Sequence, residues 1–356
     1  MQYQHPITLD CNIFGLQRFG GISNYWSKLL DYVSIDPELS GGLILPSRLL
    51  FKEFDCSWLA RMDVGREILP VGISRYLPAL NSGREDVFHT PYYRLPMRKV
   101  GKYVVTVHDF TYERFRTGVA RFVHSKQKLL SIHRADAVIC VSESTRRDVI
   151  EFCPEIDIAK LHVIHLGVDG KSFYQDSVHP INAHEKMVLF VGQRGGYKRF
   201  DLAVEAVRQS PCLSIGVVGS ELKDHERALL QARLGTRWHE FGPVSTEDLR
   251  RLYSSVFALI FPSDYEGFGL PILEAMACGC PVVVAALSSL PEVGGTAAYY
   301  AESQTGESYA KALSALESAS ERKAAVLRGI ARAAEFDWLR TLQKTKAVYL
   351  DRRLCS

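Results

Sequence analysis

The chain has 356 residues, and 43 Lys and Arg against 40 Asp and Glu leave a net charge of +3. The length favours two domains of similar size, and 47% hydrophobic with 23% charged residues excludes a disordered chain. So small a charge excludes a nucleic-acid coat, and no nucleic-acid partner is expected. Apolar stretches fall far short of the ~20 residues that span a bilayer. Asp10 and Asn12 interrupt the first apolar patch, so we expect no secretion signal and a cytoplasmic protein.

Short apolar runs rich in β-branched residues alternate with helix-length amphipathic stretches along the chain. Runs of roughly 4–8 such residues between helices are typical of parallel strands covered on both faces. The pattern occurs in both halves and predicts two doubly wound α/β domains. The predicted strands are residues 87–89, 103–107, 137–141 and 161–166 in the first half, and 187–191, 214–218, 257–261 and 281–285 in the second.

Helix start and stop signals support this alternation. Ser245 precedes a threonine and two acidic residues, which predicts a helix N-cap. Residues 200–207 carry apolar side chains at helical spacing. Pro271 and Gly279 bracket a short predicted helix, and the segment after about Ser303 is predicted to be helical to its end.

Eight cysteines are sparse for a chain of this length, and none forms a Cys-x-x-Cys pair. Cys278 and Cys280 flank a glycine in an apolar setting. We therefore expect buried, reduced thiols, as in a reducing compartment. Because no His and Cys cluster has the spacing of metal ligands, no zinc is expected.

The most specific segment is a glycine-containing loop followed by the short helix at Pro271. The N–H groups of Phe268, Gly269 and Leu270 lie at this helix start, where an anion or hydroxyl oxygens are favoured. Glu266 in the loop and Glu274 in the first helical turn are both expected to face one crevice. There they accept hydrogen bonds from the vicinal hydroxyls of a sugar and a ribose. The alternative is a capped helix with a loop carboxylate and nothing bound.

A second glycine-rich loop follows the first predicted strand of the second half. Gly192 allows close backbone approach, while Arg194 and Lys198 supply positive charge at the carboxyl end of the strand. Such a loop suits a diphosphate at the edge of the sheet. It is neither a P-loop nor a G-x-G-x-x-G fingerprint, so it does not indicate an ATPase or a dehydrogenase. Solvated loop charges are the alternative.

Two features of the first half lie at comparable positions. Gly20 and Gly21 form a glycine turn before the amphipathic run of residues 25–33, which is typical of a helix N-terminus near a ligand. His108 ends a predicted strand of a doubly wound sheet, where ligands bind in the crevice. An isolated histidine is more often structural, and this alternative stays open.

A basic stretch runs from Arg114 to Arg134, with phenylalanines interleaved and Glu113 as its acidic residue. One interpretation is a solvated helix face. The other is peripheral contact of this face with anionic lipid or with a lipid diphosphate at the inner membrane.

Together these segments resemble the retaining glycosyltransferase family 4, whose fold is named GT-B. The most specific shared pattern is E-x-F-G-x-x-x-x-E, which Glu266, Phe268, Gly269 and Glu274 match. The resemblance covers nearly the whole chain and is strongest over residues 187–300. The segment Phe-Gly-Gly-Ile-Ser at residues 19–23 and the loop Arg-Gly-Gly-Tyr-Lys at residues 194–198 are similar to those of bacterial enzymes that build O-antigens and other surface polysaccharides. The resemblance implies two Rossmann-like domains that face a central cleft.

The resemblance also implies roles for individual residues. Arg194 and Lys198 would hold the nucleotide diphosphate in place of a divalent metal, and their charge would stabilise the departing diphosphate. The resemblance therefore implies no metal and no other cofactor, with the nucleotide-sugar as co-substrate. Glu266 and the N–H groups at the helix start would hold the donor sugar, and Glu274 the ribose. His108 would contact the donor sugar, while the glycine pair of the first half would let its helix approach phosphate and acceptor.

The implied domains are residues 1–172, which bind the acceptor, and residues 187–337, which bind the donor. The polar stretch 173–186 is the expected linker, and a terminal helix over residues 338–356 is expected to pack on the first domain.

The expected function is transfer of a hexose from a nucleotide-sugar to a lipid-linked or growing glycan, with retention at the anomeric carbon. GDP-mannose is the favoured donor, followed by UDP-hexoses and deoxysugar nucleotides. One alternative is a GT-B relative such as a sugar-nucleotide 2-epimerase or a phosphorylase. Another is a catalytically silent GT-B scaffold in an assembly complex.

Overall fold

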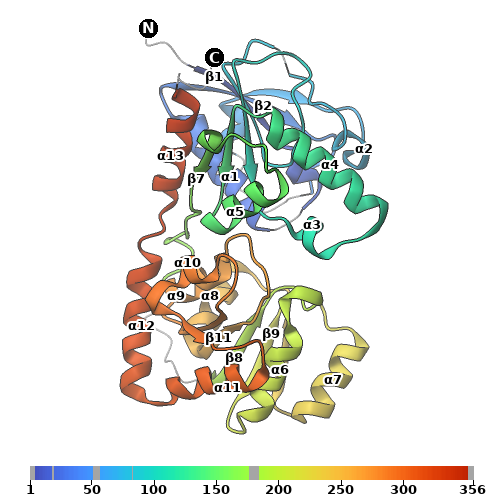
Figure 1. The fold of residues 1–356 in the computed structure, drawn as a ribbon. Coiled ribbons are helices and arrows are strands. Elements are labelled where there is room, and N and C mark those ends of the chain that lie inside the picture. The colour runs from blue at the N-terminus through green and yellow to red at the C-terminus, as the bar shows by residue number, and fades with distance from the viewer. Residues whose placement is uncertain (1–4, 18–19, 51–56, 82, 176–183, 352–356) are drawn as a thin grey trace. The chain divides into compact units, whose positions relative to one another are not determined.

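A computed structural model describes residues 5–17, 20–50, 57–81, 83–175 and 184–351 (Figure 1). The chain forms two compact units. Unit 1 comprises residues 1–166 and 338–356, and unit 2 comprises residues 167–337. Each unit is a parallel sheet with helices on it, so the predicted pair of doubly wound α/β domains is confirmed.

Unit 1 contains a seven-stranded parallel sheet in the order β3-β2-β1-β4-β5-β6-β7. Its strands are β1 (His5–Asp10), β2 (Leu39–Leu45), β3 (Asp63–Arg66), β4 (Val87–Thr90), β5 (Lys102–Val107), β6 (Ala137–Cys140) and β7 (Leu161–Val163). Its α-helices are α1 (Gly21–Ile35), α2 (Val71–Ser74), α3 (Thr111–Phe115), α4 (Gly118–Arg134), α5 (Glu143–Phe152) and α13 (Trp338–Leu350). The strand order reverses between β1 and β4, so this pair marks the topological switch point of the unit.

Helix α13 is attached to unit 1 through polar contacts with buried residues of the sheet. The fully buried Lys102 of β5 donates from Nζ to the carbonyl oxygens of Val348 and Tyr349, at 2.9 and 3.1 Å. These carbonyls end the helix, where a cation is favourable. The hydroxyl of Tyr349 also lies 2.6 Å from Nδ1 of His89, whose pKa burial holds well below its usual value. The terminal helix thus belongs to the fold of unit 1.

Unit 2 contains a six-stranded parallel sheet in the order β10-β9-β8-β11-β12-β13. Its strands are β8 (His184–Val191), β9 (Ser214–Val218), β10 (Trp238–Gly242), β11 (Val256–Phe261), β12 (Val282–Ala285) and β13 (Tyr299–Ala301). Its α-helices are α6 (Phe200–Gln209), α7 (Asp224–Leu234), α8 (Thr246–Ser255), α9 (Leu270–Ala277), α10 (Leu290–Gly294), α11 (Gly306–Ser314) and α12 (Ala319–Ala333). The order reverses between β8 and β11, so ligands are expected at the carboxyl ends of these two strands.

The predicted helix signals of unit 2 have clear structural counterparts. The Ser245 hydroxyl accepts a hydrogen bond from the Asp248 N–H at 3.1 Å and caps α8. Helix α9 has a proline at its start and is followed by Gly279 with φ +76°, the left-handed conformation that ends helices.

Several predicted boundaries need correction. The predicted linker 173–186 includes residues that belong to unit 2. Phe173 is buried and packs 6.3 Å, ring to ring, from Tyr253, and β8 already begins at His184. Unit 2 begins at Gly167 instead of after residue 172, and strand β7 ends at Val163 instead of residue 166. Residues 176–183 of the linker and 352–356 of the terminal helix lie outside the described residues.

Some elements and side chains were not anticipated. The described cysteines are free, but Cys212 is exposed and Cys153 half-buried, so the expectation of burial is wrong for these two. Five strands are absent from the predicted list, namely β1, β2, β3, β10 and β13. For β2 and β3 the reason is clear, because β2 contains two glycines and every residue of β3 is exposed, which weakens the apolar pattern. Among the described helices, none is long and apolar enough to cross a membrane.

Candidate active site

Two loops come together at the switch point of unit 2. One follows β8 and begins with Gly192, whose φ of +126° is accessible to glycine. The other follows β11 and leads into α9, with Gly269 as N-cap at φ +108°. Because β8 and β11 are neighbouring parallel strands, both loops lie at the same edge of the sheet (Figure 1).

An ion pair joins the two loops. Lys198 Nζ donates to Glu266 Oε1 at 2.5 Å, and the two side chains are 18% and 13% exposed. The main chain of Glu266 is held as well, because its N–H donates to the Ser288 hydroxyl and its carbonyl accepts from Ser289, both at 2.9 Å. The structure therefore brings together two of the predicted site residues, a cation and a carboxylate, on a fixed backbone.

Backbone strain accompanies this pair. Arg199 and Ser288 have φ of +49° and +50°, in the left-handed region that non-glycine residues rarely adopt. Arg199 follows Lys198 directly, and Ser288 binds the N–H of Glu266. Each such conformation costs about 1–3 kcal/mol and persists where the surroundings enforce it, which is typical of ligand sites.

Arg194 has a different environment from Lys198. Its Nε donates to Glu226 Oε1 of α7 at 3.0 Å and its Nη2 to the carbonyl of Glu221 at 2.8 Å, and its side chain is 3% exposed. Burial alone would raise the pKa of Glu226, but the hydrogen bond and charge of Arg194 lower it below the usual value. Arg194 is thus a buried, anchored arginine and not a solvated loop charge. Its Nη1 lacks a hydrogen-bond partner among the described residues.

Glu274 lies in the second turn of α9, which corrects its predicted place in the first turn. The Tyr253 hydroxyl of α8 donates to Glu274 Oε2 at 3.4 Å. Burial raises the pKa of Glu274 to about 7. The two motif carboxylates are therefore in different environments, because Glu266 faces a lysine whereas Glu274 faces a phenol in an apolar setting.

The helix start between the two glutamates is fixed by side chains of the next loop. The Ser289 hydroxyl donates to the carbonyl of Phe268 at 2.8 Å, and the Phe268 ring packs edge-on at 5.9 Å from Phe336. Gly269 is the N-cap and Leu270 the first helical residue. Their position directs the first N–H groups of α9 toward the carboxyl edge of the sheet.

In unit 1 the predicted residues lie at the start of α1 and the end of β5. Gly20 is the N-cap of α1 and Gly21 its first residue, while Phe19 lies outside the described residues. His108 is 7% exposed, and its ring packs edge-on at 5.4 Å from Tyr25 of α1. Burial lowers the pKa of His108 to about 4, so the ring is neutral. Within the described part of the chain its Nε2 has no hydrogen-bond partner.

Sequence analysis missed two groups at these edges. Asn12 follows β1 at the switch point of unit 1 and is fully buried, and neither of its amide atoms has a partner among the described residues. Asp264 lies two residues before Glu266 and binds Arg199 and Gln304. The partners of Asp264 lie 65 and 40 positions away, so no local pattern reveals them.

The basic stretch is only partly a surface feature. Arg114 donates to Asp148 and Glu151, each at 2.6 Å, and the buried Lys128 donates to Glu113 at 2.6 Å. These two cations are neutralised within unit 1. The remaining basic residues are exposed, namely Arg116, Arg121, Lys126 and Arg134.

Exposed apolar residues accompany the remaining cations on α4. Val119, Phe122 and Val123 are 79%, 62% and 41% exposed. With Lys126 they occupy positions three, four and seven apart, which share one helix face. The Lys126 ammonium lies 5.5 Å from the centre of the Phe122 ring. We call Val119, Phe122, Val123 and Lys126 the exposed α4 face.

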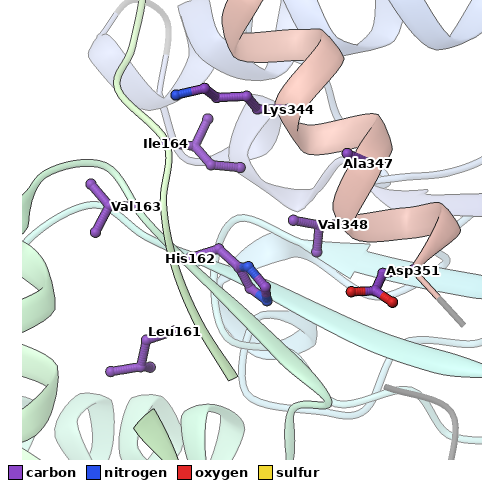
Figure 2. Close-up of a pocket in the computed structure, with 8 residues that line it drawn as sticks. All are labelled: Leu161, His162, Val163, Ile164, Lys344, Ala347, Val348 and Asp351. Carbon is purple, nitrogen blue, oxygen red and sulfur yellow. The ribbon is translucent and has the colours of Figure 1, made fainter. Parts of the chain in front are cut away.

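A groove of about 420 Å³ lies elsewhere in unit 1, between β7 and α13 (Figure 2). Its lining includes His162, Lys344 and Asp351, and no residue of the predicted site. In the described ranges, no group of three His, Cys, Asp or Glu side chains could hold a metal ion.

Comparison with known proteins shows the family of this chain. Residues 58–171 match the sequence model of the family described as Glycosyltransferase Family 4, and residues 174–331 match that of Glycosyl transferases group 1. O-antigen chain mannosyltransferase B of Escherichia coli is 30% identical over 302 residues, 76% of either chain. O-antigen chain mannosyltransferase RfbU of Salmonella typhimurium is 28% identical over 252 residues, 66% of either chain.

Solved structures show the same fold. Sucrose-phosphate synthase from Thermosynechococcus elongatus has a TM-score of 0.79 at 19% identity, and the match covers 99% of this chain and 100% of that one. WaaG, a glycosyltransferase involved in lipopolysaccharide biosynthesis, has a TM-score of 0.73 at 14% identity, with 97% and 100% covered. Identity this low establishes the GT-B fold alone. Together with the family matches and the relative from E. coli, it shows that the chain is a glycosyltransferase and belongs to glycosyltransferase family 4.

Proposed function

We propose that this protein is a retaining mannosyltransferase of bacterial surface-polysaccharide synthesis, with GDP-mannose as donor and a lipid-linked or growing glycan as acceptor. The C1–O bond between the sugar and the diphosphate breaks, and the acceptor hydroxyl oxygen forms the new bond to C1. The hydroxyl proton leaves with the diphosphate. The products are a glycoside of unchanged anomeric configuration and a nucleoside diphosphate.

The observation that carries this proposal is the Lys198–Glu266 pair at the switch point of unit 2. A cation at this edge attracts the diphosphate, and a carboxylate beside it accepts hydrogen bonds from sugar hydroxyls. Negative charge that develops on the leaving diphosphate is stabilised by Lys198, by Arg194 through its unpaired Nη1, and by the N–H groups at the start of α9. With these donors the reaction needs no resident metal.

Glu274 and His108 have supporting roles in the proposal. A ribose hydroxyl donates to Glu274, and the ionised carboxylate is the better acceptor. His108 is neutral because burial lowers its pKa to about 4, so it serves as a hydrogen-bonding group for the donor sugar and not as a cation. Gly20 and Gly21 leave room for phosphate or acceptor at the start of α1.

The donor sugar and the acceptor are inferred from two relatives. Both carry names that describe O-antigen chain mannosyltransferases, and the longer match covers 76% of either chain. We assign mannose as the transferred hexose on this basis. A polysaccharide of the cell surface is built on a lipid carrier, so the acceptor lies at a membrane.

Contact with that membrane is assigned to the exposed α4 face. Val119, Phe122 and Val123 enter the boundary between headgroups and acyl chains, while Lys126 attracts anionic lipid. In this proposal the enzyme acts in the cytoplasm, peripheral to the inner face of the membrane. It excludes Arg114 and Lys128 from the contact, because both are paired within unit 1.

The test is a transfer assay with a panel of nucleotide-sugars and lipid-linked glycans extracted from a polysaccharide-producing bacterium. We expect mannose transfer from GDP-mannose and an NMR spectrum in which the new glycosidic bond has the configuration of the donor. Inversion at C1 would contradict the retaining assignment. Epimerised nucleotide-sugar in a reaction without acceptor would instead indicate the 2-epimerase alternative.

A further inference from the structure

Three loops of unit 2 meet at one carboxylate, Asp264, two residues before Glu266. The loops follow β8, β11 and β13, whose carboxyl ends share one edge of the sheet. The Asp264 N–H donates to the carbonyl of Tyr197 at 2.7 Å. Its Oδ1 accepts from Arg199 Nη1 at 3.4 Å and from Gln304 Nε2 at 2.8 Å. Asp264 therefore connects each of these loops to the other two.

The side chain of Gln304 is itself held in one orientation. Its Nε2 donates to the carbonyl of Pro262 at 3.3 Å as well as to Asp264, and its Oε1 accepts from the Tyr309 hydroxyl at 2.5 Å. Tyr309 is fully buried in α11. Because the hydroxyl donates to the amide oxygen, the amide nitrogen must face Asp264.

This network cross-links the same two loops as the site ion pair. Lys198 binds Glu266, and the next residue, Arg199, binds Asp264. A main-chain hydrogen bond from the Asp264 N–H to the Tyr197 carbonyl joins the same two loops. A displacement of Asp264 must therefore move Glu266 relative to Lys198. A shift of about 1 Å at reacting groups can cost roughly 100-fold in rate.

We propose that Asp264, Gln304 and Tyr309 are positioning residues for the transfer reaction, which hold Glu266 opposite Lys198 without contacting substrate. The inference rests on the proposed function. It assigns to the loop after β13, which carries none of the family's motif residues, a part in the geometry of the site. Charge stabilisation of the leaving diphosphate depends on preorganised geometry, so the network acts on the transition state more than on ground-state binding.

The test compares Gln304→Ala, Tyr309→Phe and Asp264→Asn with the matched control Glu302→Gln. Glu302 lies on the same loop, but its carboxylate pairs with Lys311 at 2.8 Å and both side chains are largely exposed. We expect kcat to fall about 10-fold in Gln304→Ala and Asp264→Asn and a few-fold in Tyr309→Phe, with KM for the nucleotide-sugar within about two-fold. Glu302→Gln should match the wild type.

A double variant and the melting temperature separate positioning from a merely structural role. Because Gln304 acts through Asp264, the Asp264→Asn/Gln304→Ala enzyme should lose little more kcat than either single variant. Additive losses overturn the proposal, and so do variants that melt earlier while kcat remains that of the wild type. A wild-type enzyme that transfers no sugar refutes the proposed function and the inference with it. A working wild type with unaffected variants refutes the inference alone.

Discussion

The carboxyl edges of the two sheets differ in how their polar groups are paired. In unit 2 the charged side chains are paired, since Lys198 binds Glu266 and Arg194 binds Glu226, and only Nη1 of Arg194 among these atoms lacks a partner in the described ranges. In unit 1 His108 and Asn12 are buried, and each keeps ring or amide atoms without a partner in the described ranges. Paired charges on fixed loops suit a ligand of constant chemistry such as a diphosphate. Unpaired neutral donors and acceptors suit hydroxyl groups, whose arrangement differs from one glycan to another.

The largest effect should come from breaking the ion pair of unit 2. Lys198→Ala and Glu266→Ala should each lower kcat by about 10²–10³, because preorganised groups at the leaving diphosphate and the donor sugar are lost. The transfer assay with GDP-mannose measures this, and circular dichroism checks that both units stay folded. Activity within a few-fold of the wild type in either variant would show that the active site does not lie at this edge of the sheet.

A second prediction concerns Glu274, whose pKa burial raises to about 7. Between pH 4.5 and 7 the folded protein keeps a proton that the unfolded chain releases, so the free energy of unfolding falls as pH rises through this window. Glu274→Gln removes this dependence. The free energy of unfolding of the variant minus that of the wild type should therefore be larger at pH 8 than at pH 4.5, by on the order of 3 kcal/mol. Melting curves at the two pH values measure it, and a constant difference would refute it.

The buried histidine of unit 1 should have the opposite dependence. Burial lowers the pKa of His108 to about 4. Between pH 6.5 and 4 the unfolded chain takes up a proton that the folded protein excludes, so the free energy of unfolding falls as pH falls. From pH 8 to pH 5 the wild type should lose on the order of 2 kcal/mol more than His108→Phe. Parallel losses in chemical denaturation at the two pH values would contradict the buried, neutral histidine.

The smallest effect concerns the exposed α4 face. Lys126→Gln should weaken binding to vesicles of anionic phospholipid about five-fold, because one cation near such a surface contributes about 1 kcal/mol. Lys344→Gln removes the same charge from the exposed surface of α13 and should leave vesicle binding unchanged. Sedimentation with vesicles measures both. Equal losses in the two variants would show that net charge, and not this face, governs the contact.

At the carboxyl edges of the two sheets, the sequence predicts the strands and loops better than it predicts the ion pairs. Buried β-branched runs such as those of β5 and β11 identify their strands, and the spacing of Glu266 from Glu274 identifies the loop and helix that carry them. The pairing of Arg194 with Glu226 spans 32 positions, and that of Arg114 with Asp148 spans 34. No local pattern indicates which distant carboxylate neutralises a given cation, so anchored and solvated charges look alike in sequence.

Unit 1 is harder to predict for a related reason. Lysine is rarely buried, so the sequence does not predict that Lys102 is fully buried. Its ammonium group donates to carbonyl oxygens of α13, which lie almost 250 positions away. In the sequence, Asn12 is recognisable only as a polar residue that interrupts an apolar run. A polar side chain whose partner is a ligand has no partner within the protein. It is recognised only in the structure, as a buried polar group without a hydrogen bond.

The central claim is that unit 2 holds the donor through Lys198 and Glu266. Calorimetric titration of the wild type and of Lys198→Ala with GDP-mannose and UDP-glucose tests it most directly, because binding needs no acceptor. We expect GDP-mannose to bind the wild type more tightly than UDP-glucose does, and to bind Lys198→Ala at least about 10-fold more weakly, as loss of a charged contact to phosphate requires. Equal affinity of GDP-mannose for both proteins, or no binding of either nucleotide-sugar to the wild type, would contradict the account.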